Sequence, residues 1–132
     1  MKLLLDTHCW LWWFGQPGLL KDEVVEQIVD EANEVWFSVA STWEIGIKAA
    51  AGKLSFPEPL ESYFPSRMQE IGARSLEITS THAIRAAALP PHHRDPFDRM
   101  LIAQAQIERM MLVSSDSVFK KYDVSVLKAA KS

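Results

Sequence analysis

The sequence lacks the cysteines from which disulfide-linked or zinc-bound small proteins are built. Its 132 residues contain one cysteine, Cys9, which excludes an internal disulfide framework and favours a reducing compartment. There is no C-x-x-C or H-E-x-x-H pattern, and the adjacent His92 and His93 point in divergent directions, so a zinc site is disfavoured. Cys9 lies in an apolar run beside no activating base, which disfavours a thiol nucleophile.

A hydrophobic run long enough to cross a bilayer is also missing. The apolar start at 3–5 stops at Asp6, and the run at 9–14 is too short. We therefore expect no secretory signal, no membrane span and a cytoplasmic location. The composition, 48% hydrophobic and 23% charged residues, is ordinary for a folded protein, and the length predicts one domain over 1–132.

The basic excess typical of nucleic-acid binders is absent as well. The chain has 14 basic and 17 acidic residues, for a net charge of −3. If four of the acids are metal ligands, however, the remaining 13 are balanced by the basic residues, and a bound cation adds positive charge where a phosphate would lie. Net charge therefore neither supports nor excludes an RNA substrate.

Short β-like runs alternate with helix-like segments along the chain. The segment 2–6 is apolar without alternation, as expected of a strand buried on both faces. Pro65 predicts a break in the helical segment 57–71. Further helices are expected at 22–33, 41–52, 80–89, 96–110 and 116–122, and further strands at 35–38, 76–78, 111–114 and 125–127. This alternation predicts an α/β fold: three α/β/α layers with a central, mostly parallel sheet of about five short strands.

Four acidic residues follow the predicted strands. Asp6 ends the first strand, and Asp116 follows the strand at 111–114. Glu44 and Asp98 lie in the first turns of helices. Ligands bind at the carboxyl ends of parallel strands, so we expect all four acids at one edge of the sheet.

Three of these acids also have a purely structural interpretation. Glu44 could close a capping box with Ser41 or pair with Lys48 four residues later. Asp98 could favour the dipole of its helix, and Asp116 could cap the last helix. Taken one at a time, each of the three is better explained in this way.

Two observations favour a metal site instead. A carboxylate that ends a buried leucine-rich strand, as Asp6 does, is costly unless something compensates its charge. Asp98 shares a helical stripe with Leu101 and Ile102, so it faces inward. Converging carboxylates raise one another's pKa, and a divalent cation removes that penalty; oxygen ligands of this kind suit Mg²⁺ or Mn²⁺.

Two other enzyme or signalling classes also use acids at strand ends. A phosphatase with an aspartyl nucleophile has a second Asp two residues after the first, where this chain has His8. A receiver-like signalling domain needs paired acids early and a lysine late, and neither is evident. Both alternatives are disfavoured.

Four motifs together resemble the PIN-domain family, and more narrowly its VapC-type bacterial toxins. They are Leu-Leu-Leu-Asp-Thr-His at 3–8 followed by Leu11-Trp12, Ser-Val-Ala-Ser-Thr-Trp-Glu-Ile at 38–45, His-His-Arg-Asp-Pro-Phe-Asp-Arg at 92–99, and Leu-Val-Ser-Ser-Asp at 112–116. They occur in the family's order and span nearly the whole chain.

The resemblance implies a metal-dependent endoribonuclease that acts as the toxin of a toxin–antitoxin pair and leaves 5′-phosphate and 3′-hydroxyl ends. It implies that one or two Mg²⁺ or Mn²⁺ ions are held by Asp6, Glu44, Asp98 and Asp116. It further implies that Thr7, Ser41 and Ser115 support these ligands by hydrogen bonds, and that Arg99 contacts a phosphate or carboxylate. A decayed nuclease that only binds its antitoxin is the alternative, and the presence of all four acids disfavours it.

The resemblance also implies a homodimer and a small cognate VapB-like antitoxin whose tail covers the acidic site. An aromatic cluster is formed by Trp10, Trp12, Trp13 and Phe14. Its side chains cannot all face inward, so some apolar surface should remain for a partner. We expect the antitoxin to dock on these tryptophans and on the helices that begin at Asp22 and Pro57.

Overall fold

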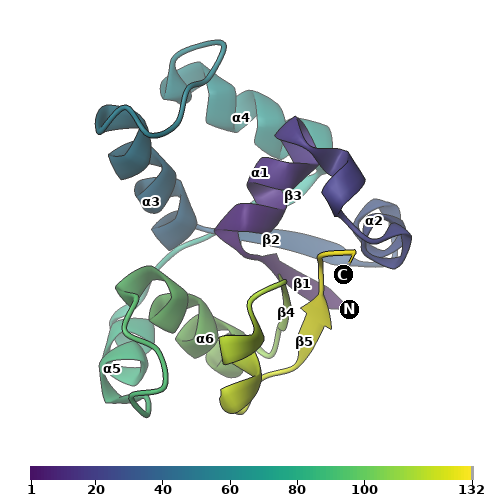
Figure 1. Cartoon of the computed structure of the whole chain (residues 1–132). Helices are drawn as coiled ribbons and strands as arrows, with labels where there is room; N and C mark the ends of the chain where they lie inside the picture. Colours follow the sequence, from purple (N-terminus) through teal and green to yellow (C-terminus); the bar gives the residue numbers. More distant parts are fainter. Residues whose placement is uncertain (132) are drawn as a thin grey trace.

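The computed structural model describes residues 1–131, which form a five-stranded sheet with helices on both faces (Figure 1). The sheet order is β3-β2-β1-β4-β5, and every neighbouring pair is parallel. The strands are β1 (Lys2–Leu5), β2 (Glu34–Ser38), β3 (Ala73–Leu76), β4 (Met111–Ser114) and β5 (Val126–Lys128). The predicted α/β fold with a central parallel sheet is confirmed.

The order of the strands creates one switch point. From β1 the chain adds β2 and β3 on one side and then crosses to add β4 and β5 on the other. Connections that leave the carboxyl ends of β1 and β4 therefore diverge, and in open parallel sheets such a switch point is where ligands bind. The first strand is the central one, so whatever follows it lies in the middle of the molecule.

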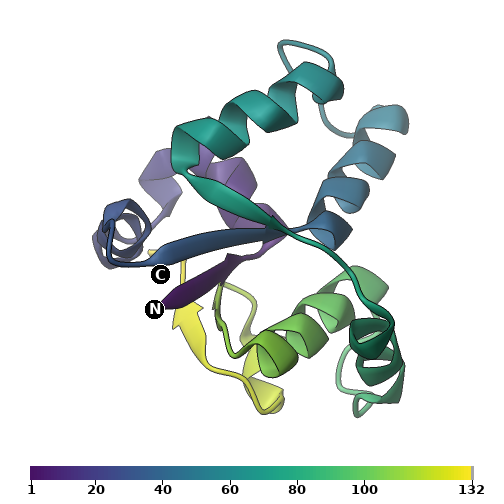
Figure 2. The same cartoon turned by 180° about the vertical axis from the view of Figure 1, so that it is seen from behind.

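Alternating side chains of β1 pack into two hydrophobic clusters on opposite faces of the sheet. Leu3 and Leu5 point into a cluster beneath α1 (Thr7–Gly15), α2 (Asp22–Val29) and α4 (Leu60–Ile71). Leu4 points into a second cluster formed with α6 (Pro96–Glu108), against which α5 (Ser80–Ala88) packs. Figure 2 shows these two helical layers from behind. The remaining elements are α3 (Val39–Ala50) and the short 3₁₀ helices η1 (Pro17–Leu19) and η2 (Ser117–Lys121).

Helix α1 was not among the expected helices. Its residues are apolar on nearly every side, so they show no amphipathic period. Trp10 is fully buried and stacks on Phe37 of β2, with ring centroids 4.2 Å apart. Trp12 and Trp13 are half-buried, which leaves part of the expected apolar surface exposed.

Two further expectations about the helices are wrong. Helix α3 begins at Val39 with Ser38 as its N-cap rather than at residue 41, so the alternative in which Glu44 closes a capping box with Ser41 does not apply. Helix α4 continues through Pro65 without a break. Pro65 lies in the second turn, and the neighbouring Tyr63 and Phe64 pack their rings into the aromatic core, which holds the helix together despite the missing N–H.

The third strand is also displaced from its expected position at 76–78. It runs from Ala73 to Leu76, directly after Gly72, which ends α4 in a left-handed conformation with φ of 73°. No helix within residues 1–131 is long and apolar enough to cross a membrane.

A buried glutamine joins three elements beside the carboxyl edge. Gln104 of α6 is 0% exposed and accepts a 2.6 Å hydrogen bond from the Ser38 hydroxyl at the end of β2. Its amide donates to the carbonyl of Glu77, after β3, at 3.2 Å. The Ser38 hydroxyl in turn accepts from the Ala40 amide and starts α3.

We expect Gln104→Leu to lower the free energy of unfolding by about 2–3 kcal/mol, because the Ser38 hydroxyl and the Glu77 carbonyl lose their buried partner. Chemical denaturation measures the change. Gln106→Leu, two residues along at a half-exposed position, is the matched control and should change stability by less than about 0.5 kcal/mol. Equal losses in both variants would contradict this role for Gln104.

Candidate metal centre

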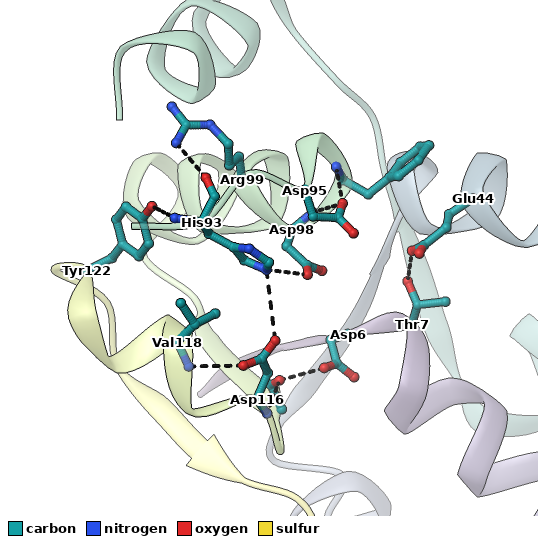
Figure 3. Close-up of polar contacts among 12 residues, drawn as sticks. Asp6, Thr7, Glu44, His93, Asp95, Asp98, Arg99, Asp116, Val118 and Tyr122 are labelled. Carbon is teal, nitrogen blue, oxygen red and sulfur yellow. Dashed lines mark hydrogen bonds and ion pairs between the residues drawn. The ribbon is translucent and has the colours of Figure 1, made fainter. Parts of the chain in front are cut away.

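The switch point between β1 and β4 carries two of the predicted acids. Asp6 follows β1 and caps α1, and Asp116 follows β4 and caps η2 by accepting from the Val118 amide at 3.0 Å. A third acid, Asp98, reaches the same space from the first turn of α6. Figure 3 shows the carboxylates of Asp6, Asp98 and Asp116 facing one another across this space.

Asp6 is buried, with 4% of its surface exposed. One carboxylate oxygen accepts from the Cys9 amide at 2.8 Å, and the other accepts from the Ser114 hydroxyl at 2.5 Å. Burial raises the pKa of Asp6 above its ordinary value of 3.8, although these hydrogen bonds oppose the shift. The interpretation that Asp6 has no structural role is wrong, because it starts α1, a helix that the sequence pattern did not reveal.

Asp98 lies beside a second carboxylate that caps the same helix. Asp95 accepts from the amides of Phe97 and Asp98 at 2.8 and 3.2 Å. Burial, and then the negative charge of Asp95, raise the pKa of Asp98 from 3.8 to about 6. The charge of Asp6 adds to the shift, which shows that these carboxylates affect one another.

A histidine completes the cluster. The His93 Nε2 atom lies 2.7 Å from Asp98 Oδ2 and 3.8 Å from Asp116 Oδ2 (Figure 3). One possible ligand atom from each of these three residues lies within 4.8 Å of the others. From the sequence, His93 was considered only as a zinc ligand and was not placed beside the acids. Its position two residues before the cap of α6 is the available signal, because such a residue can fold back over the first helical turn.

Glu44 is held differently from the other three acids. It is 7% exposed, and its carboxylate accepts from Thr7 Oγ1 at 2.7 Å and pairs with Lys48 Nζ at 3.0 Å. The pairing with Lys48 is the structural alternative considered for this residue. In Figure 3, Glu44 lies to one side of the cluster, above Thr7.

Only some of the residues expected to support the ligands contact one of the four acids. Thr7 contacts Glu44, as the resemblance implies. Ser41 is buried, and its hydroxyl has no hydrogen-bond partner among the described residues. The serine that contacts Asp6 is Ser114 rather than Ser115, and its Oγ also accepts from the Asp116 amide at 3.1 Å.

Arg99 does not contact a carboxylate. Its guanidinium donates to main-chain carbonyls, among them those of Leu89 at 2.8 Å, Ala86 at 2.9 Å and His93 at 3.1 Å. The resemblance implied a carboxylate or phosphate partner. In the structure Arg99 instead fixes the end of α5 and the loop that carries His93.

The donor set fits a small divalent cation. Asp98, Asp116 and His93 each offer a ligand atom within 4.8 Å of the others, and Asp6 faces the same space. Burial raises the pKa of Asp6 and of Asp98, and for Asp98 the charges of Asp95 and Asp6 add to the shift. A cation between them would relieve both effects, and oxygen ligands suit Mg²⁺ and Mn²⁺. Cys9 is buried, and its thiol pKa is raised well above the ordinary value by burial and by the Asp6 charge, which further disfavours a thiolate nucleophile.

Fold and site together define a parallel α/β protein with an acidic centre at its switch point. Residues 3–125 match the sequence model of the PIN domain, and the chain therefore belongs to the PIN-domain family. Two relatives come from Mycobacterium tuberculosis. Ribonuclease VapC22 is 29% identical over 115 residues, covering 86% of each chain, and Ribonuclease VapC16 is 39% identical over 75 residues, covering 54% of this chain and 53% of that protein.

Solved structures with the same fold include toxin–antitoxin complexes. VapBC2 from Rickettsia felis, bound to a DNA fragment from its promoter, matches with a TM-score of 0.73 at 14% identity over 98% of this chain and 99% of that one. A toxin–antitoxin complex from Klebsiella pneumoniae matches with a TM-score of 0.59 at 20% identity over 96% of each chain. At these identities the likeness shows the fold.

The raised pKa of Asp98 predicts a pH-dependent stability. Its folded-state pKa of about 6 exceeds the unfolded value, so its contribution to stability is full below pH 4 and is lost as the pH rises through 6. In EDTA we expect Asp98→Asn to be more stable than the wild type by about 3 kcal/mol at most at pH 7.5, and by little at pH 4.

Denaturation at both pH values measures this difference. Asp123→Asn, which neutralises an exposed acid, is the matched control and should have a small effect throughout. If Asp98→Asn is less stable than the wild type at pH 7.5, or if its gain in free energy of unfolding does not change with pH, then ionisation of Asp98 does not destabilise the fold.

Proposed function

We propose that the protein is a metal-dependent endoribonuclease that acts as the toxin of a toxin–antitoxin pair. The observation that carries the proposal is the convergence of three carboxylates, one of them buried, at the β1/β4 switch point. The family and the two relatives named as ribonucleases support RNA as the substrate. Mg²⁺ or Mn²⁺ is the proposed cofactor, held by Asp6, Asp98 and Asp116, with Glu44 at the side of the site.

The proposed reaction is hydrolysis of an RNA phosphodiester by in-line attack of water, leaving a 5′-phosphate and a 3′-hydroxyl. A bound divalent cation would lower the pKa of water and stabilise negative charge on the phosphate. The chain contributes rigid positioning: Asp6 is fixed by Cys9 and Ser114, and Asp116 by its cap on η2. Any of these carboxylates that is not engaged by the cation can accept the proton from water.

We expect the purified protein to cleave cellular RNA at defined positions with Mg²⁺ or Mn²⁺ and to lose this activity in EDTA. Asp6→Asn and Asp98→Asn should each reduce the rate by about 100-fold or more, because ligand charge and water orientation are both lost. Asp123→Asn should cleave like the wild type. Sequencing of the cut ends measures the products and tests the predicted 5′-phosphate.

Cleavage that survives both EDTA and Asp6→Asn would refute the metal-centred mechanism. If cleavage is absent and calorimetry also detects no binding of Mg²⁺ or Mn²⁺, the protein is an interaction module rather than an enzyme. Circular dichroism of each variant shows that a loss of cleavage does not reflect unfolding.

We further propose that a small antitoxin binds a groove between α1 and α4. The groove has a volume of about 490 Å³ and is lined mainly by apolar side chains, among them Leu11, Trp12, Phe56 and Tyr63. Its lining includes His8, two residues from Asp6, so a partner in the groove would lie close to the acidic site. The solved complexes with this fold support a protein partner of this kind. Helix α2 does not line this groove.

We expect Trp12→Lys to weaken binding of the cognate antitoxin by at least 10-fold, because a charge replaces an aromatic ring in the groove. Calorimetry with the purified pair measures the affinity. Ile84→Lys, at an exposed position on α5, is the control and should bind normally. Equal binding by both variants would place the partner elsewhere on the surface.

The homodimer and the cytoplasmic location are further proposals. Val39, Trp43 and Ile47 form an exposed apolar stripe along α3, and Trp43 is 64% exposed. A second copy of the chain would cover this stripe, which is otherwise an unusual surface for a monomer.

A further inference from the structure

The imidazole of His93 occupies a position within the acidic centre rather than behind it. We propose that His93 binds the catalytic cation directly through Nε2, so that the centre has one nitrogen ligand and prefers Mn²⁺ to Mg²⁺. The inference rests on the proposed metal-dependent function and assigns a ligand beyond the four acids.

The distances favour a ligand over a residue that only supports Asp98. Donor atoms around an octahedral cation at about 2.1 Å lie roughly 3 Å apart along an edge and about 4.2 Å apart across it. The Nε2 atom is 2.7 Å from Asp98 Oδ2 and 3.8 Å from Asp116 Oδ2. Small movements of these side chains would therefore bring the three atoms to the spacing of donor atoms around one cation. A histidine that only supports a ligand would contact a single carboxylate on the side away from the cation. His93 instead faces two carboxylates that come from different elements.

The loop around His93 holds the ring in place through its main chain. The His93 amide donates to Tyr122 Oη at 2.9 Å, and the Tyr122 hydroxyl donates to the carbonyl of Pro90 at 2.7 Å. The His93 carbonyl accepts from Arg99 at 3.1 Å. Phe119 lies against the ring, which is only 20% exposed. Tyr122 and Arg99 are therefore positioning residues that fix His93 before any cation binds.

A nitrogen ligand changes which cation the centre favours. Mg²⁺ is a hard cation that takes oxygen ligands and keeps much of its water. First-row transition ions accept imidazole more readily, and Mn²⁺ is the member of that series closest to Mg²⁺ in its use of carboxylates. A site with three carboxylates and one imidazole should therefore select Mn²⁺ over Mg²⁺ more strongly than the carboxylates would alone.

Pulsed electron paramagnetic resonance of the full chain loaded with Mn²⁺ tests the ligand directly. We expect modulation from a coordinated imidazole nitrogen in the wild type and its loss in His93→Gln, whose amide can still donate to Asp98. His92→Gln is the matched control: His92 is exposed, packs edge-on to Tyr122 and should leave the modulation unchanged. By calorimetry, His93→Gln should lower the preference for Mn²⁺ over Mg²⁺ by about 10-fold.

Mn²⁺ binding without nitrogen modulation in the wild type overturns the inference and leaves the proposed function standing. Modulation that persists in His93→Gln also overturns it, because another histidine such as His8 would then be the ligand. Failure of the wild type to bind Mn²⁺ or Mg²⁺ refutes the metal-dependent function together with this inference. Because the wild-type spectrum decides the presence of a nitrogen ligand, the test does not depend on the stability of the variant.

Discussion

A negative charge buried at the end of the central strand governs the rest of this structure. Asp6 follows a strand whose three leucines are fully buried, so its carboxylate cannot reach bulk water. The fold compensates it with the Cys9 amide in the first turn of α1 and with the Ser114 hydroxyl from the neighbouring strand. These contacts reduce the cost without removing it, and the pKa of Asp6 remains raised. A positive charge placed in the centre would compensate the remaining cost.

The helices around the acidic centre begin at that centre, and their N-terminal hydrogen bonds hold its side chains in place. Asp6, Ser38, Asp95 and Asp116 each accept a hydrogen bond from an amide at the start of a helix. The positive ends of α1, α3 and α6 point toward the acids and partly offset their repulsion. Two of these caps, Asp6 and Asp116, are themselves proposed ligands, and a third, Asp95, caps the helix that carries Asp98, so the chemistry depends on how the helices start.

The two proposed roles of the protein meet on α1. Its first turn includes Thr7, which contacts Glu44, while its later residues Leu11 and Trp12 line the apolar groove. A partner in that groove would lie against the same helix that Asp6 caps. The proposed antitoxin groove and the proposed catalytic centre therefore share one short helix.

Much of this architecture could be predicted from the sequence. The unalternating leucines of β1 and the alternation of strands and helices predict a parallel sheet, and that topology brings acids at strand ends to one edge. The sequence did not reveal α1, because a helix that is apolar on nearly every side has no amphipathic period. It also could not place Pro65 within a helix that aromatic packing holds together.

The details of the centre were decided by tertiary structure. The pairing of β1 with β4, in which Leu5 lies opposite Val113, places Ser114 rather than Ser115 beside Asp6. The loop contacts of Tyr122 and Arg99 turn His93 toward the acids, and Lys48 engages Glu44. The sequence by itself determined which residues could meet at the carboxyl edge, because the alternation of strands and helices along the chain and the side-chain period are local properties. Which oxygen and nitrogen atoms face the common space depends on strand register and loop contacts between distant residues, and these exist only in the folded chain.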